Sequence, residues 1–295
     1  MVHKFLVLFA IISLSLLPQP GSFIRDAHAT DGHLLEIGRG AKLRSDREAF
    51  TAMKVVSYNI RWRSGDELKK LIELLKTDPE IGGATIIGLQ EVDRNKKRSQ
   101  NTNTARLLAN ELGMHYAWAA PPSPKPNQEE ETGVALLSVY PLSEVSRIVL
   151  PHEGPGSRRR VGIGATVHLD KAKMRVYSVH SEVRISTDKK LEQMNAVLED
   201  LGKYSKDMPA IVVGDLNTWE PGAAEKTRKL FVSAGFHTPF KDESTFRQRV
   251  LMVPIKFKLD WVWLRNVDAS NSGIDKEISL SDHWPLWVGL KLKST

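Results

Sequence analysis

The sequence predicts an α/β (α+β) protein in which β-sheets of mixed strand direction carry helices on their outer sides. Two observations lead to this fold class. Short β-rich runs alternate with amphipathic helical patterns along most of the chain, and several strand-like runs also follow one another without a helix between them. Alternation alone would indicate a parallel sheet, whereas successive strands require antiparallel pairing, so the sheets should be mixed.

Helices are predicted where apolar residues recur at three- and four-residue spacing. The first helical pattern has Leu68, Leu71, Ile72 and Leu75 on one face. The second ends at Gly113, which is a typical helix stop signal. The predicted helices cover residues 65–77, 103–113, 187–204 and 221–235.

Strands are predicted over ten runs rich in β-branched and aromatic residues, namely 53–60, 84–90, 114–119, 133–138, 144–150, 160–168, 173–179, 209–214, 258–264 and 285–292. The Pro-rich stretch 120–132 is predicted to be a surface loop, because strand signals continue on both sides of it. Residues 30–52 are polar and mixed, which predicts a leader or edge segment before a single domain over 53–295.

The N-terminus has the pattern of a secretory signal peptide. Lys4 precedes an apolar run over residues 5–17, which is too short for an ordinary transmembrane span. An A-x-A pattern ends at Ala29, so residues 1–29 are predicted to be removed on export. An uncleaved membrane anchor is the alternative. We therefore expect an exported protein, periplasmic or secreted, whose mature chain is a monomer without a transmembrane segment.

The composition limits the chemistry that is open to the chain. With 295 residues, 41% hydrophobic and 26% charged, the chain can bury a sizeable core, and its composition does not indicate disorder. It contains no cysteine, which excludes thiol catalysis, cysteine–zinc sites and disulfides. The net charge of +7 favours anionic partners such as nucleic acid, phosphorylated metabolites or anionic membrane surfaces, without choosing among them.

Polar side chains stand at the ends of six predicted strands. Four strands are followed by Asn59, by Glu91, by His180 and by the pair Asp215 and Asn217, and the last two are preceded by Asp260 and by the pair Asp282 and His283. A strand that runs in the opposite direction presents its start where the others end. Antiparallel placement of the last two strands would therefore gather all of these side chains in one cleft.

Each of these residues also has a simpler interpretation when it is taken alone. Asn59 is typical of a turn after a strand, and the Asp-x-Asn at 215–217 is typical of an Asx turn. His180 alone could be a buried structural histidine, and Asp260 could cap its strand. Six such positions in a compatible order are much harder to explain by chance, which favours a shared site.

The residue types match the hydrolysis of a phosphoester. Carboxylates without cysteine or clustered histidine favour a hard cation, Mg²⁺ or Mn²⁺, over zinc. Asparagine amides orient a phosphate or a water without adding charge, and a histidine beside an aspartate has its charged form stabilised. A cation to offset charge, a base to activate water and donors for the phosphoryl oxygens are the parts that this reaction needs.

Six segments resemble, in order, the motifs of the endonuclease/exonuclease/phosphatase superfamily. This superfamily includes DNase I-like nucleases, abasic-site endonucleases, inositol polyphosphate phosphatases and bacterial sphingomyelinases. The segments are SYNIRW, IIGLQEVD, VYSVHS, VVGDLN, LDWVWL and LSDHWPL, and together they span about residues 53–292. The resemblance implies a four-layer α/β sandwich, with two packed mixed β-sheets flanked by helices on both outer faces.

The resemblance also implies a metal site. Glu91 is expected to be the principal Mg²⁺ ligand, with Asn59 and Asp282 close to the metal. Two positions depart from the family pattern: the segment 132–135 stands where a Gly-Asn pair is common, and Val139 stands where an arginine is common.

Five further residues receive catalytic roles from the resemblance. Asp215 is expected to orient or deprotonate the attacking water, and Asn217 to hold the phosphate. His180 is expected to stabilise the transition state or to assist the leaving group. His283, paired with Asp260, is expected to stabilise phosphate charge or to serve as acid or base. The resemblance leaves open which residue is the base and whether one or two metal ions act.

The substrate is less constrained than the reaction. The basic stretches 96–98 and 158–160 could follow a nucleic-acid backbone, grip a phosphorylated head group or form solvated loops, and Trp62 is expected to pack in the core rather than to stack on a base. No long exposed aromatic hairpin of the kind used by membrane-acting sphingomyelinases is evident. The leading hypothesis is an exported Mg²⁺-dependent phosphodiesterase, most simply a nuclease. The alternatives are a phosphatase or phospholipid phosphodiesterase with the same site, and a non-catalytic phosphate-binding protein.

Overall fold

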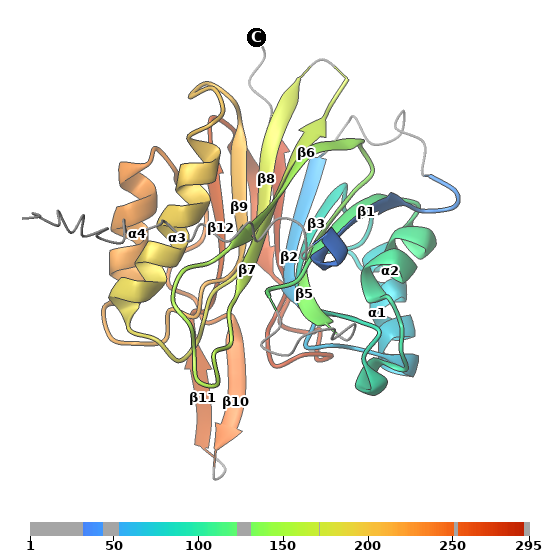
Figure 1. Cartoon of the computed structure of the whole chain (residues 1–295), viewed down its shortest axis with the longest axis horizontal. Coiled ribbons are helices and arrows are strands. Elements are labelled where there is room, and N and C mark those ends of the chain that lie inside the picture. The colour runs from blue at the N-terminus through green and yellow to red at the C-terminus, as the bar shows by residue number, and fades with distance from the viewer. Residues whose placement is uncertain (1–31, 44–52, 123–130, 171, 251–252, 292–295) are drawn as a thin grey trace, which may run out of the picture. The chain divides into compact units, whose positions relative to one another are not determined.

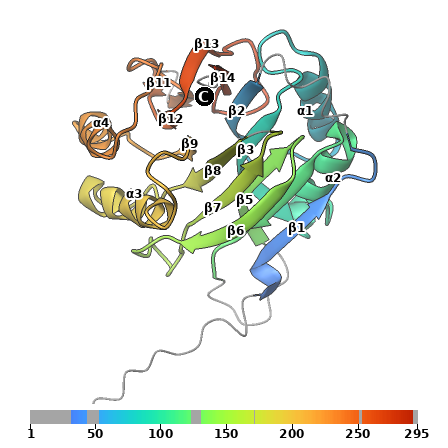
Figure 2. The same cartoon turned by 90° about the horizontal axis from the view of Figure 1, so that it is seen from above.

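Two mixed β-sheets packed face to face form the centre of the fold (Figures 1 and 2), which confirms the predicted sandwich. In spatial order, the seven-stranded sheet consists of β1 (Leu35–Arg39), β4 (His115–Ala119), β5 (Glu131–Ser138), β3 (Ile86–Arg94), β2 (Met53–Asn59), β14 (Leu286–Lys291) and β13 (Asp268–Ile274). The five-stranded sheet consists of β12 (Asp260–Arg265), β9 (Ala210–Asp215), β8 (Lys173–His180), β7 (Val161–His168) and β6 (Leu142–Val149). The pairs β2–β3 and β8–β9 are parallel, and the other neighbouring pairs are antiparallel.

Helices cover the outer faces of both sheets. In Figure 2, α1 (Gly65–Thr77) and α2 (Thr104–Leu112) lie outside the seven-stranded sheet, whereas α3 (Thr187–Leu201) and α4 (Ala223–Ser233) lie outside the five-stranded one. These are the α-helices of the described residues, and each was predicted. The apolar face of α1 is buried as its spacing predicts, and α2 ends at Gly113, whose φ of 65° is easily adopted by glycine.

The strands of the five-stranded sheet contribute to two apolar cores. Along β9, Ala210 and Val212 belong to the core under α3 and α4, whereas Ile211 and Val213 belong to the core between the sheets. Successive side chains of a strand point to opposite faces, so a strand covered on both faces must be apolar throughout. This explains why the run that precedes Asp215 has no polar residue. The core thus holds the end of β9, and the carboxylate there, in place.

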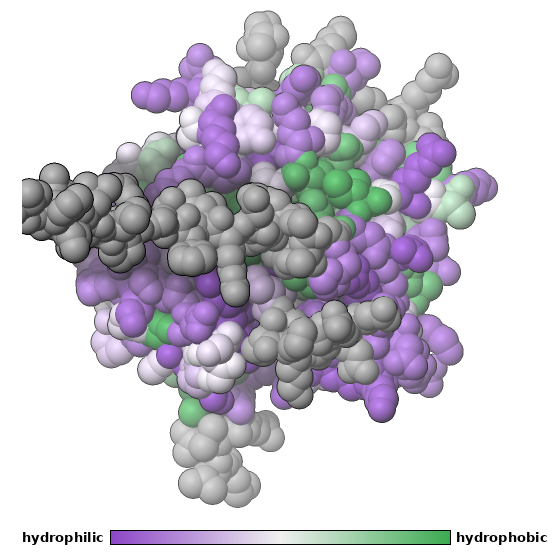
Figure 3. Space-filling model, in the orientation of Figure 1, coloured by the Kyte–Doolittle hydropathy of each residue, from purple (hydrophilic) through white to green (hydrophobic). Residues whose placement is uncertain are grey.

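The structure is a computed structural model, and it describes residues 32–43, 53–122, 131–170, 172–250 and 253–291. The segment 1–29, predicted to be a signal peptide, lies outside these residues. Among the described residues, no helix is both long and apolar enough to span a membrane. The face of the molecule seen in Figure 3 is mainly hydrophilic.

Four strands were not predicted from the sequence. β1 pairs with β4 at the edge of the large sheet, so the compact unit begins at His33 and not at Met53. β13 has the polar sequence DASNSGI, and its pairing with β14 overrides its low strand propensity. β10 (Phe246–Val250) and β11 (Val253–Phe257) form a hairpin that extends away from the sheets at the lower edge of Figure 1. The aromatic residues of this hairpin, Phe246 and Phe257, lie at its base.

The two sheets approach closely at Gly88 on β3. A Cβ atom at this position would lie 2.3 Å from Cγ2 of Val213 on β9 and 3.4 Å from Cβ of Ser178 on β8. Val213 is β-branched and fully buried, so its methyl group cannot turn away. Glycine at position 88 therefore sets the distance between the sheets.

We predict that Gly88→Ala destabilises the protein by about 1–3 kcal/mol, because the added methyl group overpacks the contact between the sheets. The second substitution Val213→Ala should remove part of this cost. In urea denaturation, the double variant should thus be more stable than the sum of the two single effects predicts. Strictly additive effects would contradict the proposed contact.

Candidate active site

The strand pairing brings the predicted polar residues to one edge of the sandwich. His180 and Asp260 are both register partners of Asp215, one on each neighbouring strand. β12 runs antiparallel to β9, and β14 runs antiparallel to β2, which confirms the expected direction of the last two strands. The ends of β2, β8 and β9, a position within β3 and the starts of β12 and β14 therefore contribute to the same site.

The carboxylate of Asp215 lies at the centre of this site. Its Oδ2 accepts a hydrogen bond from Nδ2 of Asn59 at 3.0 Å, and it lies 3.6 Å from Nε2 of His180 and 3.7 Å from Nε2 of His283. Its Oδ1 accepts a hydrogen bond from the backbone N–H of Asn217 at 3.0 Å. Burial raises the pKa of Asp215 to about 7, although the charge of His283 opposes this shift.

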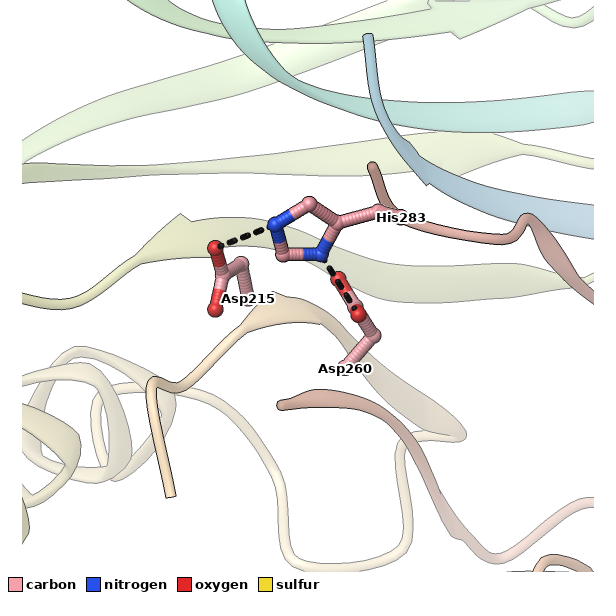
Figure 4. A group of neighbouring side chains, drawn as sticks. All are labelled: Asp215, Asp260 and His283. Carbon is pink, nitrogen blue, oxygen red and sulfur yellow. Dashed lines mark hydrogen bonds and ion pairs between the residues drawn. The ribbon is translucent and has the colours of Figure 1, made fainter. Parts of the chain in front are cut away.

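His283 lies between two carboxylates, as Figure 4 shows. Its Nδ1 is 2.8 Å from Oδ2 of Asp260, and its Nε2 faces Asp215. Burial alone would lower the pKa of His283, but the negative charges of Asp260 and Asp215 outweigh this effect and raise the pKa to about 10. His283 is therefore an imidazolium at neutral pH, with a proton on each ring nitrogen.

His180 has the opposite surroundings. Its Nδ1 lies 3.2 Å from Nη1 of Arg160, whose Nε donates to the buried carboxylate of Glu182 at 3.1 Å. Because a guanidinium has only donors, Nδ1 of His180 must accept, and its proton must be on Nε2. Burial, together with the charges of Arg160 and His283, holds the pKa of His180 well below its usual 6.5. His180 is thus a neutral donor that points toward Asp215.

Glu91 occupies a β-bulge within β3. From the sequence, we had expected Glu91 to follow the end of that strand. Its φ of 56° lies in the left-handed region, which is unfavourable for a residue with a Cβ atom. A bulge redirects a side chain away from the regular alternation of the strand. Nδ2 of Asn59 lies 3.4 Å from Oε1 of Glu91, whereas Oε2 is buried without a hydrogen-bond partner.

The other two residues expected near the metal already have partners. Asn59 donates from Nδ2 to Asp215 and Glu91 and accepts from the backbone N–H of Arg61, so it orients both carboxylates. Asp282 forms an ion pair with Arg61, with 3.0 Å between Oδ2 and Nη1. Of the three residues expected at the metal, Glu91 is the one with an unpartnered buried oxygen. This oxygen fits the hard donor that Mg²⁺ prefers.

Asp215, Asp260 and His283 form a second group with suitable spacing, because their ligand atoms all lie within 4.8 Å of one another. A metal ion would need a lone pair on His283, and therefore the loss of one of its protons. The charges of the two carboxylates also favour the doubly protonated ring, so a metal ion and a proton would compete for this group. Two places among the described residues thus offer ligand atoms for a cation, namely this group and the unpartnered oxygen of Glu91.

A cleft of about 460 Å³ opens beside these residues, with Glu91 and His180 in its wall. The wall also contains five cationic side chains, namely Lys96, Arg98, Arg158, Arg159 and Arg160. Trp62 lines the cleft, whereas we had expected it to pack in the core. The guanidinium of Arg98 lies 4.1 Å from the ring centroid of Trp62. Both basic stretches predicted from the sequence thus border the site.

Glu182, which was not predicted as a site residue from the sequence, organises this basic wall. Its carboxylate is fully buried and accepts hydrogen bonds from Arg158 and Arg160, at 2.9–3.1 Å. These bonds hold the two arginines beside His180. A sequence signal for Glu182 was its position two residues beyond the predicted site residue His180. Nothing in the sequence, however, pairs Glu182 with arginines more than 20 residues away.

The base of the β10–β11 hairpin also contacts the site. The ring of Phe246 lies edge-on to His283 with 5.0 Å between centroids, and the backbone N–H of Arg247 donates to the carbonyl of Asp282 at 2.8 Å. The hairpin therefore supports the segment that carries His283.

The fold is shared with several solved structures. The chain is similar to an endonuclease/exonuclease/phosphatase family protein from Leptotrichia buccalis, at 17% identity and a TM-score of 0.64 over 82% of this chain and 100% of that one. It is also similar to the human Nocturnin catalytic domain with bound sulfate (18% identity, TM-score 0.62, 81% and 93% covered). TDP2 from D. rerio, complexed with a single-strand DNA product, matches at 14% identity and a TM-score of 0.62, with 82% and 99% covered.

Comparison at the level of sequence gives a complementary result. No curated protein matches the chain significantly. The profile of one family, however, matches residues 56–283, a range that includes Asn59, Glu91 and His283. Members of this family hydrolyse phosphoesters and typically depend on divalent metal ions. The chain therefore belongs to the Endonuclease/Exonuclease/phosphatase family.

Proposed function

We propose that the protein is an exported, Mg²⁺-dependent phosphodiesterase, most simply a nuclease, that cleaves by attack of water on phosphorus. One observation carries this proposal. The buried carboxylate of Asp215 lies between a neutral histidine and a charged one, beside a glutamate that has an unpartnered oxygen. An acceptor for a water proton and donors for phosphoryl oxygens thus lie within a few ångströms of each other.

Asp215 is the proposed base. Its pKa of about 7 is close to neutral pH, where a carboxylate can both exist ionised and accept a proton. Asn59 and the backbone N–H of Asn217 hold its two oxygens in place. One Nδ2 hydrogen of Asn217 donates to the carbonyl of Ser181, which leaves the second for a phosphoryl oxygen.

The two histidines would act on the phosphate in different ways. His283, kept charged by Asp260, offers a cationic Nε2–H that can stabilise negative charge on a phosphoryl oxygen. His180, kept neutral beside Arg160, offers an Nε2–H donor without adding another charge. Asp260 is thus a positioning residue for His283.

Glu91 would hold the metal ion, with Asn59 and Asp282 in its surroundings. The donor set consists of oxygens, which suits Mg²⁺ or Mn²⁺, and Oε2 of Glu91 has no other partner. When bound, such an ion offsets the charge of the phosphate and that of the leaving oxygen. Asn59 keeps the other oxygen of Glu91 oriented, so that Oε2 faces the site.

The basic wall of the cleft favours a nuclease over the other phosphoesterases that this family contains. Arg158 and Arg160 are held by Glu182, and Arg98 is held by Asp93, so their guanidinium groups are already ordered for anionic groups. A polynucleotide offers a series of such groups beside the scissile one. A phosphatase with a singly phosphorylated substrate, or a phospholipid phosphodiesterase, would use the same reacting centre but would bring fewer anionic groups to these cations.

We predict that Glu91→Gln and Asp215→Asn each lower the Mg²⁺-dependent hydrolysis of bis-p-nitrophenyl phosphate by about 100-fold or more, because one removes the metal ligand and the other the base. The measurement is the release of p-nitrophenol with Mg²⁺ and with EDTA. Val232→Ala, an exposed residue of α4, serves as the control and should retain activity. Unchanged hydrolysis in both active-site variants would refute the proposed site.

We predict that Asp260→Asn costs about 3 kcal/mol of stability near pH 6, because it leaves His283 buried without its main counter-charge. The pKa of His283 is raised in the folded state, from 6.5 to about 10. The stabilisation is therefore fully present below pH 6.5 and is lost as the pH rises through about 10. In urea denaturation, the difference between wild type and variant should shrink over that range.

The exposed pair His237 and Asp268, separated by 3.9 Å, provides a matched control. Asp268→Asn should cost little at any pH, since exposed ion pairs contribute little to stability. A stability difference for Asp260→Asn that does not change with pH would contradict the charged state of His283.

Export can be tested on the full chain produced in a bacterial host. We predict a product in the periplasm or medium that begins at Thr30, because cleavage follows Ala29. Mass spectrometry of the secreted fraction measures this, and Ala29→Arg should block the cleavage. A full-length product that remains membrane-bound would support an uncleaved anchor instead.

A further inference from the structure

Trp219 is the one exposed aromatic side chain in the described part of the chain, at 42% of its maximal exposure. It lies two residues beyond Asn217, on the loop that leads from β9 to α4. An exposed indole offers a flat face on which a planar ligand can stack. Neither the fold nor the proposed reaction accounts for this exposure.

The indole of Trp219 is fixed in orientation. Its Nε1 donates to the carbonyl of Val183 at 3.1 Å, and the side chain of Asn217 donates to the carbonyl of Ser181 in the same segment. The loop that carries Trp219 is thus tied to the residues that follow His180. A ring held at its nitrogen cannot turn into the core, so its orientation is set before any ligand binds.

A buried lysine lies over the ring. Nζ of Lys190 is 5.1 Å from the ring centroid of Trp219 and 3.9 Å from Oε1 of Glu220. The side chain of Lys190 is only 3–4% exposed, and its Nζ has no hydrogen-bond partner. A buried ammonium without a hydrogen bond is costly, and here the carboxylate of Glu220 offsets part of that cost. The ammonium makes the surroundings of Trp219 favourable for an electron-rich or anionic ligand.

The strands that lead to the basic wall and to Trp219 lie on either side of β8. Arg158, Arg159 and Arg160 precede β7, His180 ends β8, and Trp219 follows β9. In the five-stranded sheet, β8 lies between β7 and β9. Trp219 donates to Val183, the residue after the Glu182 that holds Arg158 and Arg160. A ligand bound along this edge can therefore contact the arginines, the reacting centre and Trp219.

From this arrangement we infer that the substrate is a single-stranded nucleic acid, whose phosphates lie along Arg158–Arg160 and whose unpaired base stacks on Trp219. The inference rests on the proposed phosphodiesterase function and narrows its substrate. Every base offers a flat face to an aromatic ring, and a basic groove with a stacking platform is the usual means of binding single strands. Bases within a duplex are already stacked on each other and are not available to Trp219.

Other phosphodiester substrates fit these surroundings less well. A phosphoinositide has no planar group for the indole. A choline lipid would bring a second cation to a ring that already has the ammonium of Lys190 over it. The structure does not distinguish DNA from RNA, since both provide unpaired bases, so the test includes both.

The test measures binding and hydrolysis separately. Fluorescence anisotropy in EDTA reports the affinity for labelled single-stranded DNA and RNA 10-mers, for the same DNA as a duplex, and for a 10-mer of abasic sugar-phosphate units. We expect the DNA or RNA single strand to bind at least about 10-fold more tightly than the duplex. Trp219→Ala should weaken single-strand binding by about 10-fold, whereas Trp219→Phe should retain most of it.

The abasic 10-mer has the same phosphate charges without bases, so its affinity should not change in Trp219→Ala. In the hydrolysis assay, Trp219→Ala should leave the turnover of bis-p-nitrophenyl phosphate within about 2-fold of wild type, because this small substrate does not reach the platform. Val232→Ala, which removes part of another exposed apolar side chain, should change neither measurement.

Any one of three results would overturn the inference. The first is equal affinity for single strand and duplex, and the second is an equal loss of affinity for abasic and ordinary strands in Trp219→Ala. The third is hydrolysis of sphingomyelin in vesicles without hydrolysis of either nucleic acid. The proposed function has its own criterion, which is the Glu91-dependent hydrolysis of bis-p-nitrophenyl phosphate. A protein that meets that criterion but shows one of these three results would be a phosphodiesterase with another substrate. A protein that fails it but binds single strands as expected would not be the proposed enzyme.

Discussion

The carboxylate of Asp215 is the interaction centre on which the rest of the site depends. One of its oxygens has Asn59, His180 and His283 around it, and these residues come from three different strand ends or starts. A buried carboxylate is costly unless donors and cations surround it, so the site requires these side chains to converge. Their convergence in turn requires that β9 lie between β8 and β12, in the register that the apolar residues of both cores impose.

Two histidines beside one aspartate have opposite protonation states, and the cause is the chemistry of their second partners. A guanidinium can only donate, so Arg160 makes Nδ1 of His180 an acceptor and keeps the ring neutral. A carboxylate can only accept, so Asp260 keeps a proton on Nδ1 of His283. Two histidines thus supply a neutral donor and a cationic donor within one site. Such a pair suits phosphoryl transfer, in which the negative charge on the phosphoryl oxygens must be balanced.

Much of the fold could be predicted because both sheets are covered on two faces. Strands such as β9 and β12 then have an unbroken apolar run between their ends, and helices such as α1 show a clear apolar stripe. β1, β13 and the hairpin strands β10 and β11 carry weaker signals, because they lie at an edge or outside the sandwich and bury less of each residue. The bulge at Glu91 was not predicted, for a related reason. A bulge interrupts the alternation of side chains between the two faces of a strand, and a short run that is apolar on both faces does not show this interruption.

The sequence by itself determined the residue types of the site, the strands that carry them, and the family to which the chain belongs. Only the tertiary structure decided which of these residues meet. Asp282 forms an ion pair with Arg61, while Arg160, which is held by Glu182, contacts His180 and keeps its ring neutral. The physical reason is that hydrogen bonds and charges act over 3–4 Å, and such distances between residues far apart in the chain are set by packing and register, which a linear pattern does not contain.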